Sequence, residues 1–194
     1  MARITDPTKL ENIKQATVSM IVEKGYNASS ISAIAAKAGV ADGYLYRHYQ
    51  SKTELVRDLF NDCLAMFFNY LQEELEAYTT FSEFVTRYHL GLANITNEHT
   101  ANAKFFIQLI NDFTFEIDSG TKQSVFDLCQ RILERGKRDN EIPESCSFID
   151  IYTIFVIIPL QTFSLFLKGF FGNFDINEKS AAMVTQTCLK IIRK

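Results

Sequence analysis

The stretch AGVADGYLYRHYQSKTELV, residues 38–56, decides how the N-terminal part of this chain folds. It places three tyrosines, an arginine and a histidine within the six positions from Tyr44 to Tyr49. A buried core rarely contains residues such as Arg47 and His48, and a solvent-exposed face rarely contains three aromatic rings. The mixture predicts a helix with one packed face and one face that contacts a partner.

A helix that begins near Asp42 separates these side chains by role. Leu45 and Tyr49 lie four residues apart, so both face inward. The other side chains fall on other faces or at the edge: Tyr44, Tyr46, Arg47 and His48. The inward residues pack, and the outward ones are available to a partner.

A second short helix precedes this one. Ser29 or Ser30 can cap the segment ISAIAAKA, and Gly39 ends it. Two short helices separated by a glycine-containing turn, packed on a longer first helix, make a helix-turn-helix unit. The sequence therefore predicts this motif at about residues 31–50.

Longer helices flank the motif. Asp6 followed by Pro7 predicts the start of a first helix that ends near residue 24. Ser51 and Glu54 have the S-x-x-E spacing of a capping box and open a long fourth helix. Apolar periodicity then predicts helices near residues 81–97, 101–117, 121–138, 148–171 and 177–193. The predicted fold class is all-α.

Composition divides the chain after residue 57. Residues 1–57 contain eight Lys or Arg and five Asp or Glu, whereas residues 58–194 contain twelve and eighteen. All 17 phenylalanines follow residue 57, beginning at Phe60. These two shifts predict a small basic domain, residues 1–53, joined through the fourth helix to a larger acidic domain, residues 54–194.

The N-terminal pattern resembles the DNA-binding domain of TetR-type transcriptional regulators over about residues 8–60. The residues that match the pattern are Ile34, Ala35, Ala38, Gly39, Val40, Gly43, Leu45, Tyr46, His48, Tyr49, Ser51, Lys52 and Leu55. The chain departs from many family members at Ala41 and Asp42, where serine and lysine are common. The resemblance implies a ligand-responsive regulator, most simply a repressor, that binds a double-stranded DNA operator as a homodimer.

The resemblance also implies roles for single residues. Tyr46, His48 and Lys52 would contact phosphates, and Ser30 and Ser32 would hold another phosphate at the start of the second helix.

The remaining DNA contacts would be to base edges, from Asp42, Gly43, Tyr44 and Arg47. Three of these residues have other interpretations. Asp42 is favoured about two to one as a simple N-cap. Tyr44 can stack on a sugar or a thymine methyl, or merely cover the neighbouring helix, and Arg47 can hold phosphate alone.

The larger domain is rich in aromatic residues on its expected helices. Eight phenylalanines are candidates for lining a cavity that binds an apolar or aromatic effector: Phe67, Phe68, Phe105, Phe106, Phe113, Phe126, Phe155 and Phe163. Filling of the core or of the dimer interface explains each of them equally well. Three acidic residues, Asp112, Glu116 and Asp118, allow a cationic effector, although a solvated face is the commoner explanation. Pro159 should kink the most apolar helix.

The segment from Ile151 to Leu167 runs without a charge for 17 residues, the lower limit for a membrane span. A helix buried in protein explains it better, because it contains Pro159 and several polar residues. In the family the last two helices pair across a two-fold axis, and both C-terminal segments here have the apolar surface that a four-helix bundle requires. No membrane association is expected.

Catalytic and metal-binding patterns are not found in the sequence. Neither HExxH nor GxSxG occurs, the cysteines are widely spaced, and His89 and His99 are isolated. We expect no enzyme activity, no metal, no cofactor, reduced thiols and a cytoplasmic location. The alternative to a regulator is a helical adaptor that has lost DNA binding, an interpretation supported by Asp42 and the weak positive charge.

Overall fold

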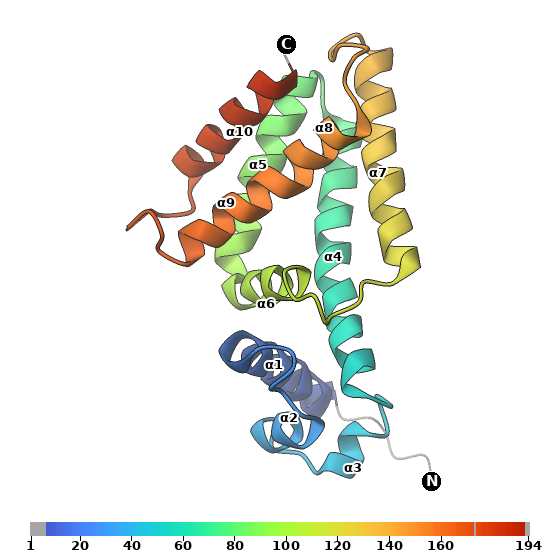
Figure 1. Ribbon diagram of the computed structural model, residues 1–194, viewed down its shortest axis with the longest axis vertical. Coiled ribbons are helices and arrows are strands. Elements are labelled where there is room, and N and C mark those ends of the chain that lie inside the picture. The colour runs from blue at the N-terminus through green and yellow to red at the C-terminus, as the bar shows by residue number, and fades with distance from the viewer. Residues whose placement is uncertain (1–6, 173, 193–194) are drawn as a thin grey trace. The chain divides into compact units, whose positions relative to one another are not determined.

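The computed structural model describes residues 7–172 and 174–192, and every regular element within them is helical (Figure 1). The elements are α1 (Pro7–Lys24), α2 (Ile31–Lys37), α3 (Asp42–Leu45), α4 (Lys52–Ala77), α5 (Phe81–Glu98), α6 (Thr100–Ile110), α7 (Ser119–Arg138), α8 (Phe148–Tyr152), the π-helical turn η1 (Thr153–Ile157), α9 (Ile158–Leu167) and α10 (Glu178–Ile192). The predicted all-α class is confirmed. The expected cap at Asp6 lies outside the described residues.

The chain forms two compact units. The head unit comprises the residues up to Leu64 together with Ala101–Glu116, and the body unit comprises Ala65–Thr100 and the residues from Ile117 onward. This division follows packing rather than function, so the expected functional boundary after residue 53 stays a prediction. The division shows that Ala101–Glu116, which is distant in sequence from the N-terminal helices, belongs to the head unit.

The head unit contains the three helices of the expected motif, with α2 and α3 joined by a short turn (Figure 1). Ile34 of α2 and Leu45 of α3 are fully buried, as is Ile13 of α1. Ser30 is the residue that caps α2, because its Oγ accepts a hydrogen bond from the N–H of Ala33 at 3.2 Å. Gly39 ends the helix with a φ of 68°, a conformation that favours glycine.

Residues 101–116 complete the core of the head unit. Phe106 stacks on Phe60 at 4.9 Å between ring centroids, and Phe115 contacts the Tyr26 ring edge-on at 5.4 Å. The amide of Asn27, in the turn after α1, donates a hydrogen bond to the hydroxyl of Thr114 at 2.8 Å. This segment therefore holds the turn between α1 and α2 by both aromatic and polar contacts.

The helix expected to begin near Asp42 and to include Tyr49 ends at Leu45, and a turn follows it. Two further helices end earlier than the apolar periodicity indicated. The helix expected over 101–117 ends at Ile110, because the carboxylate of Asp112 accepts hydrogen bonds from the backbone N–H and hydroxyl of Thr114 and forms a turn. The helix expected over 148–171 ends at Leu167, and Gly169 follows with a φ of 66°.

The body unit contains the irregular helix α8–η1–α9. Pro159 lies in the first turn of α9 and has no N–H, so it cannot donate a helical hydrogen bond to the carbonyl of Phe155, four residues earlier. The hydroxyl of Tyr88 on α5 donates to this carbonyl at 2.6 Å. The proline that was expected to kink the helix is thus accompanied by a π-helical turn, whose carbonyls bond to another helix.

His89, the next residue on α5, supports the same turn. Its Nε2 lies 3.2 Å from the carbonyl of Ile154, and its Nδ1 lies 3.1 Å from the hydroxyl of Thr185 on α10. Because a carbonyl only accepts, Nε2 carries the proton. The ring is fully buried, and this burial lowers the pKa of His89 from 6.5 to about 4. A neutral imidazole therefore links three helices of the body unit.

Candidate nucleic-acid interface

The short helix α3 and the turn that follows it have a packed side and an open side. Leu45 is fully buried and Tyr49 is 8% exposed, which confirms that these two residues face inward. Gly43 and Arg47 are exposed, and Tyr46 is 54% exposed. A Cβ added at Gly43 would meet nothing within 4 Å, so packing inside the head unit does not require glycine there. The open side is therefore accessible to a partner.

An aromatic ring lies at the centre of the charged groups on this side. The half-buried ring of Tyr44 has the guanidinium carbon of Arg47 at 5.0 Å from its centroid, and the imidazole ring of His48 lies at 5.0 Å. The ammonium of Lys9 in α1 lies 5.6 Å from the same centroid. Of this group, the sequence analysis missed Lys9. The signal available for it was a basic residue in the first turn of a helix that opens a helix-turn-helix domain.

The two hydroxyl residues of α2 have different partners. Ser30 caps its own helix, whereas Ser32 donates a hydrogen bond to the carboxylate of Asp42 at 2.5 Å. The interpretation of Asp42 as an N-cap is wrong, because Ala41 occupies the cap position and Asp42 is the first residue of α3. Its carboxylate joins α2 to α3 instead. The phosphate contacts of Ser30 and Ser32, and the base contact of Asp42, stay predictions.

Lys52 at the start of α4 contacts the head unit itself. Its ammonium donates to the carbonyl of Tyr26 at 2.8 Å and lies 4.2 Å from the centroid of the Tyr26 ring. Burial lowers the pKa of Lys52, and the nearby carboxylate of Asp112 opposes that effect. A phosphate contact from this residue would use its remaining N–H donors, and it stays a prediction.

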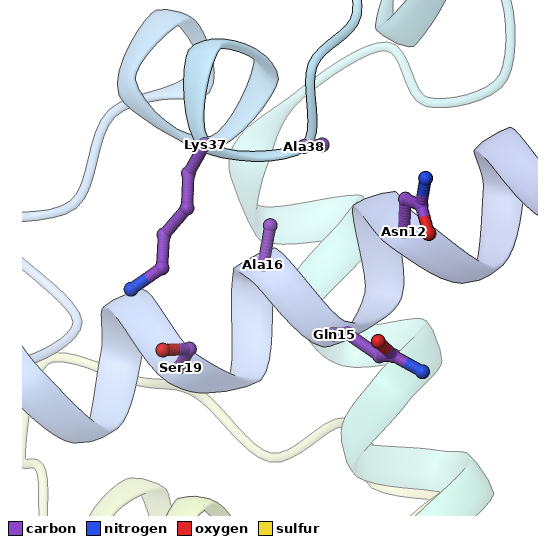
Figure 2. A pocket seen from close by; sticks show the side chains of 6 residues that line it. All are labelled: Asn12, Gln15, Ala16, Ser19, Lys37 and Ala38. Atoms are coloured by element: carbon purple, nitrogen blue, oxygen red, sulfur yellow. The ribbon is translucent and has the colours of Figure 1, made fainter.

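A shallow groove of about 320 Å³ lies between α1 and α2 (Figure 2). Polar side chains line it, together with two alanines: Asn12, Gln15, Ala16, Ser19, Lys37 and Ala38. Its one charged group, the ammonium of Lys37, pairs with the carboxylate of Glu23 at 2.7 Å. None of the predicted DNA contacts lines this groove, so it is a separate feature of the head unit.

The eight effector-site candidates are divided between the two units. Phe105 and Phe106 are buried in the head unit, and Phe113 is fully exposed. The other five belong to the body unit: Phe67, Phe68, Phe126, Phe155 and Phe163. Phe155 is packed between Phe84 and Tyr88, at 5.0 and 5.2 Å between centroids. An effector-binding role for any of the eight residues stays a prediction.

The described residues bear on two further expectations, metal binding and membrane association. No group of three or more His, Cys, Asp or Glu side chains among them is arranged to hold a metal ion. By length and apolar composition, Phe148–Leu167 is a candidate membrane span. One side of this segment is buried in the core of the body unit, where Ile154 and Phe163 lie, and the other side exposes Ile149 and Ile157.

The N-terminal part of the chain matches a known protein family. Residues 13–59 match the family described as "Bacterial regulatory proteins, tetR family". The Fatty acid metabolism regulator protein of Bacillus subtilis is 35% identical over 75 residues, and the HTH-type transcriptional repressor KstR2 of Mycolicibacterium smegmatis is 29% identical over 79 residues. These matches span 39% and 38% of the length of the two relatives.

The fold resembles solved structures over nearly its whole length. The transcriptional regulator FadR from Bacillus subtilis, solved in complex with stearoyl-CoA, has a TM-score of 0.79 and 20% sequence identity, and the match covers 94% of this chain and 99% of that one. At this identity the likeness concerns the fold alone. Together with the family match, it confirms the resemblance to TetR-family regulators.

Proposed function

We propose that this chain, whose residues 13–59 carry the tetR-family pattern, is a ligand-responsive transcriptional repressor that acts in the cytoplasm. One observation carries the proposal: α3 and the turn after it expose Tyr46 and Arg47 beside the half-buried Tyr44 and His48, while Leu45 and Tyr49 anchor this segment from behind. A helix anchored on one side and polar on the other can enter the major groove, where base edges are distinguishable.

The operator is proposed to be a pseudo-palindrome bound by a homodimer. Two recognition helices related by a two-fold axis would enter successive major grooves about 34–36 Å apart. The body unit supports the pairing, because α9 and α10 lie side by side (Figure 1) and apolar residues of α8, η1 and α10 are exposed. These residues are Ile149 of α8, Ile157 of η1 and Met183 of α10. Their burial in a four-helix bundle would remove apolar surface from water.

The effector is proposed to be a long-chain acyl thioester. A fatty acid metabolism regulator is among the relatives of this chain, and a regulator of the same fold was solved with stearoyl-CoA. The body unit offers aromatic and aliphatic side chains suited to an acyl chain, including Phe67 and Phe68 beside its core. An apolar cavity would bind the chain, and polar groups at its mouth would bind the thioester end.

Residues 101–116 are proposed to transmit the effector signal. They follow α5 of the body unit directly in sequence, yet they pack in the head unit against Tyr26, Asn27 and Phe60. An effector that moves this segment would change the orientation of α2 and α3. It would lower operator affinity only if it binds the two head arrangements with different affinity.

Fluorescence anisotropy tests this proposal. The probe is a labelled duplex from the region upstream of the protein's own gene, titrated beside a scrambled duplex, and then mixed with stearoyl-CoA, coenzyme A or stearate. We expect tighter binding of the upstream duplex and its release by stearoyl-CoA but not by coenzyme A. Phe115→Ala should bind DNA and respond less to the effector, because it removes the ring that contacts Tyr26.

The possible failures are separable. Equal, weak binding of both duplexes would favour the adaptor function. Tight binding without release by stearoyl-CoA would reject the acyl thioester while the repressor function stands. A monomer in sedimentation at micromolar concentration would reject the paired recognition helices.

A further inference from the structure

A hydrogen bond between side chains joins the two short helices of the helix-turn-helix motif. The hydroxyl of Ser32, in the first turn of α2, donates to Oδ2 of Asp42, the first residue of α3, at 2.5 Å. Both residues are exposed. The bond therefore lies at the surface of the head unit, where a partner can reach the carboxylate.

This bond determines what Ser32 can offer to DNA. A serine hydroxyl has a single O–H donor, and an ionised carboxylate only accepts, so the proton of Ser32 points to Asp42. Phosphate oxygens of DNA are also hydrogen-bond acceptors. While Ser32 donates to Asp42, it has no donor for a phosphate. The phosphate contact expected for Ser32 from the sequence and the bond in the structure exclude each other.

Asp42 keeps acceptor capacity after it has accepted this bond. A carboxylate has two oxygens with about four lone-pair positions, of which the hydroxyl of Ser32 uses one. The bond also restrains the carboxylate, because rotation of the side chain would break it. A Cβ added at Gly43, the next residue, would meet nothing within 4 Å, so the surface beside Asp42 is open. The carboxylate is therefore held in one orientation and is still able to accept.

The position and the charge of Asp42 favour one kind of DNA contact. In helix-turn-helix proteins the first residues of the second helix of the motif contact base edges, whereas the first helix crosses the DNA backbone. Phosphates repel a carboxylate. In the major groove guanine presents only acceptors, adenine places an acceptor beside its amino group, and cytosine presents its N4 amino group. Cytosine is therefore the base edge that suits Asp42.

We propose that Asp42 accepts a hydrogen bond from N4 of a cytosine in each operator half-site, and that Ser32 is a positioning residue that orients the carboxylate for this contact. The inference rests on the proposed DNA-binding function. It gives the two residues one joint effect on sequence preference, in place of a phosphate contact by Ser32. A carboxylate that faces no amino group is repelled by DNA, so the pair also weakens binding to other sequences.

The first test concerns Asp42. Full-length protein is titrated with a duplex that the wild type recovers from a random-sequence library, the selected duplex, and with a scrambled duplex of the same length. Asp42→Asn should lose on the order of tenfold in affinity for the selected duplex. It should bind the scrambled duplex at least as tightly as the wild type does, because a negative charge is removed. A selection with Asp42→Asn should lose the preference for cytosine at one symmetric position in each half-site, since a carboxamide suits the adenine edge instead.

The second test concerns Ser32. Ser32→Ala removes the donor, so it should lose about threefold in affinity for the selected duplex and relax preference at the same position as Asp42→Asn. Ser32→Thr keeps a hydroxyl and should retain the preference. In a protein that carries Asp42→Ala, adding Ser32→Ala should have almost no further effect, because both substitutions act through one carboxylate.

Ser19→Ala is the matched control for the loss of a hydroxyl. Ser19 of α1 also donates to a carboxylate in the head unit, that of Glu23 at 2.7 Å, and it is not among the expected DNA contacts. Its substitution should leave the selected sequences as they are for the wild type. Circular dichroism on heating checks that each variant stays folded.

Several results would overturn the inference. They are identical selected sequences for the wild type and Asp42→Asn, equal weakening of both duplexes by Ser32→Ala, failure of Ser32→Thr to retain the preference, or full effects of Ser32→Ala beside Asp42→Ala. Equal weakening of both duplexes is the result that a phosphate contact of Ser32 predicts. If the wild type itself recovers no sequence from the library, the proposed function fails, and that outcome is distinct from all of these.

Discussion

The head unit and the body unit use polar side chains in opposite ways. In the head, Tyr44 and Arg47 face outward around a helix that Leu45 anchors. In the body, Tyr88 and His89 face inward and bond to carbonyls of an irregular helix. This part of the head therefore leaves polar groups at its surface, whereas the body uses them to stabilise its own backbone. Substitutions at the surface of the head should change DNA binding, and substitutions of the buried polar residues of the body should change the free energy of unfolding.

The largest expected effect concerns pH and the body unit. The pKa of His89 is 6.5 when exposed and about 4 when folded, so the unfolded chain binds a proton first as pH falls. Stability should therefore decrease between pH 6.5 and pH 4, and it should be unaffected by this group above that range. Between pH 7 and pH 5 the loss should be about 2 kcal/mol.

Urea unfolding at the two pH values measures this effect. His89→Gln, which lacks the titration, should lose about 2 kcal/mol less than wild type between pH 7 and pH 5. His99→Gln, at an exposed position, is the control and should behave as wild type does. An equal pH dependence in wild type and His89→Gln would show that the buried imidazole does not destabilise the fold in acid.

Glycine substitutions in the two units should affect different properties, which are stability in the body unit and DNA binding in the head unit. A Cβ at Gly91 of α5 would overlap the hydroxyl of Tyr70, which donates to the carbonyl of Arg87. Gly91→Ala should therefore cost about 1–3 kcal/mol in the free energy of unfolding. Gly43→Ala meets open space and should increase stability by roughly 0.5–1 kcal/mol, because alanine has the higher helix propensity.

Thermal unfolding and DNA titration of the same two variants check this contrast. Gly43→Ala should weaken DNA binding if DNA approaches the backbone closely there, and Gly91→Ala should leave the binding of the folded protein intact. A stability loss for Gly43→Ala equal to that for Gly91→Ala would contradict the open side of α3.

Arg47→Ala should affect binding alone. If the guanidinium contacts a guanine edge, the substitution should cost about 1–3 kcal/mol on the selected duplex and relax sequence preference at one symmetric position in each half-site. Binding-site selection with wild type and variant measures the preference. Identical half-site logos would refute this contact and move base recognition to Asp42, Tyr44 or DNA shape.

Lys52→Ala should have the smallest effect, because its ammonium already bonds to the carbonyl of Tyr26. If it also contacts phosphate, the selected and scrambled duplexes should weaken about equally and the salt slope should become shallower by about one. Salt titration of the two duplexes decides this. An unchanged slope would assign Lys52 to the packing of the head unit alone.

The sequence predicted the head from local signals. The spacing of Leu45 and Tyr49, the hydroxyl before α2 and the glycine after it depend on neighbours within a few residues, and the structure has all of them. The role of Asp42 depends on Ser32, a residue of the preceding helix, so its local pattern predicted the wrong role. Lys9 was missed for the same reason, because its ring partner lies on α3.

The body was less predictable, because its features depend on distant partners. Pro159 predicts an interrupted helix, but neither the π-helical turn nor the two α5 residues that bond to it can be inferred from spacing. Phenylalanine content predicts a large aromatic core, without telling a core ring such as Phe155 from an exposed one such as Phe113. Aromatic side chains fill cores and line cavities alike.

The discontinuous head unit has a consequence for evolution and engineering. A chimaera that joins residues 1–53 of this chain to the remainder of a relative would lose Phe115 and Thr114, which contact Tyr26 and Asn27. The transferred helices would then pack against the corresponding loop of the relative, without the contact between the rings of Tyr26 and Phe115. Exchange of the proposed operator specificity between this chain and a relative should therefore succeed when residues 101–116 are transferred together with the N-terminal helices. Substitutions in the two segments should be tolerated best when both segments change together.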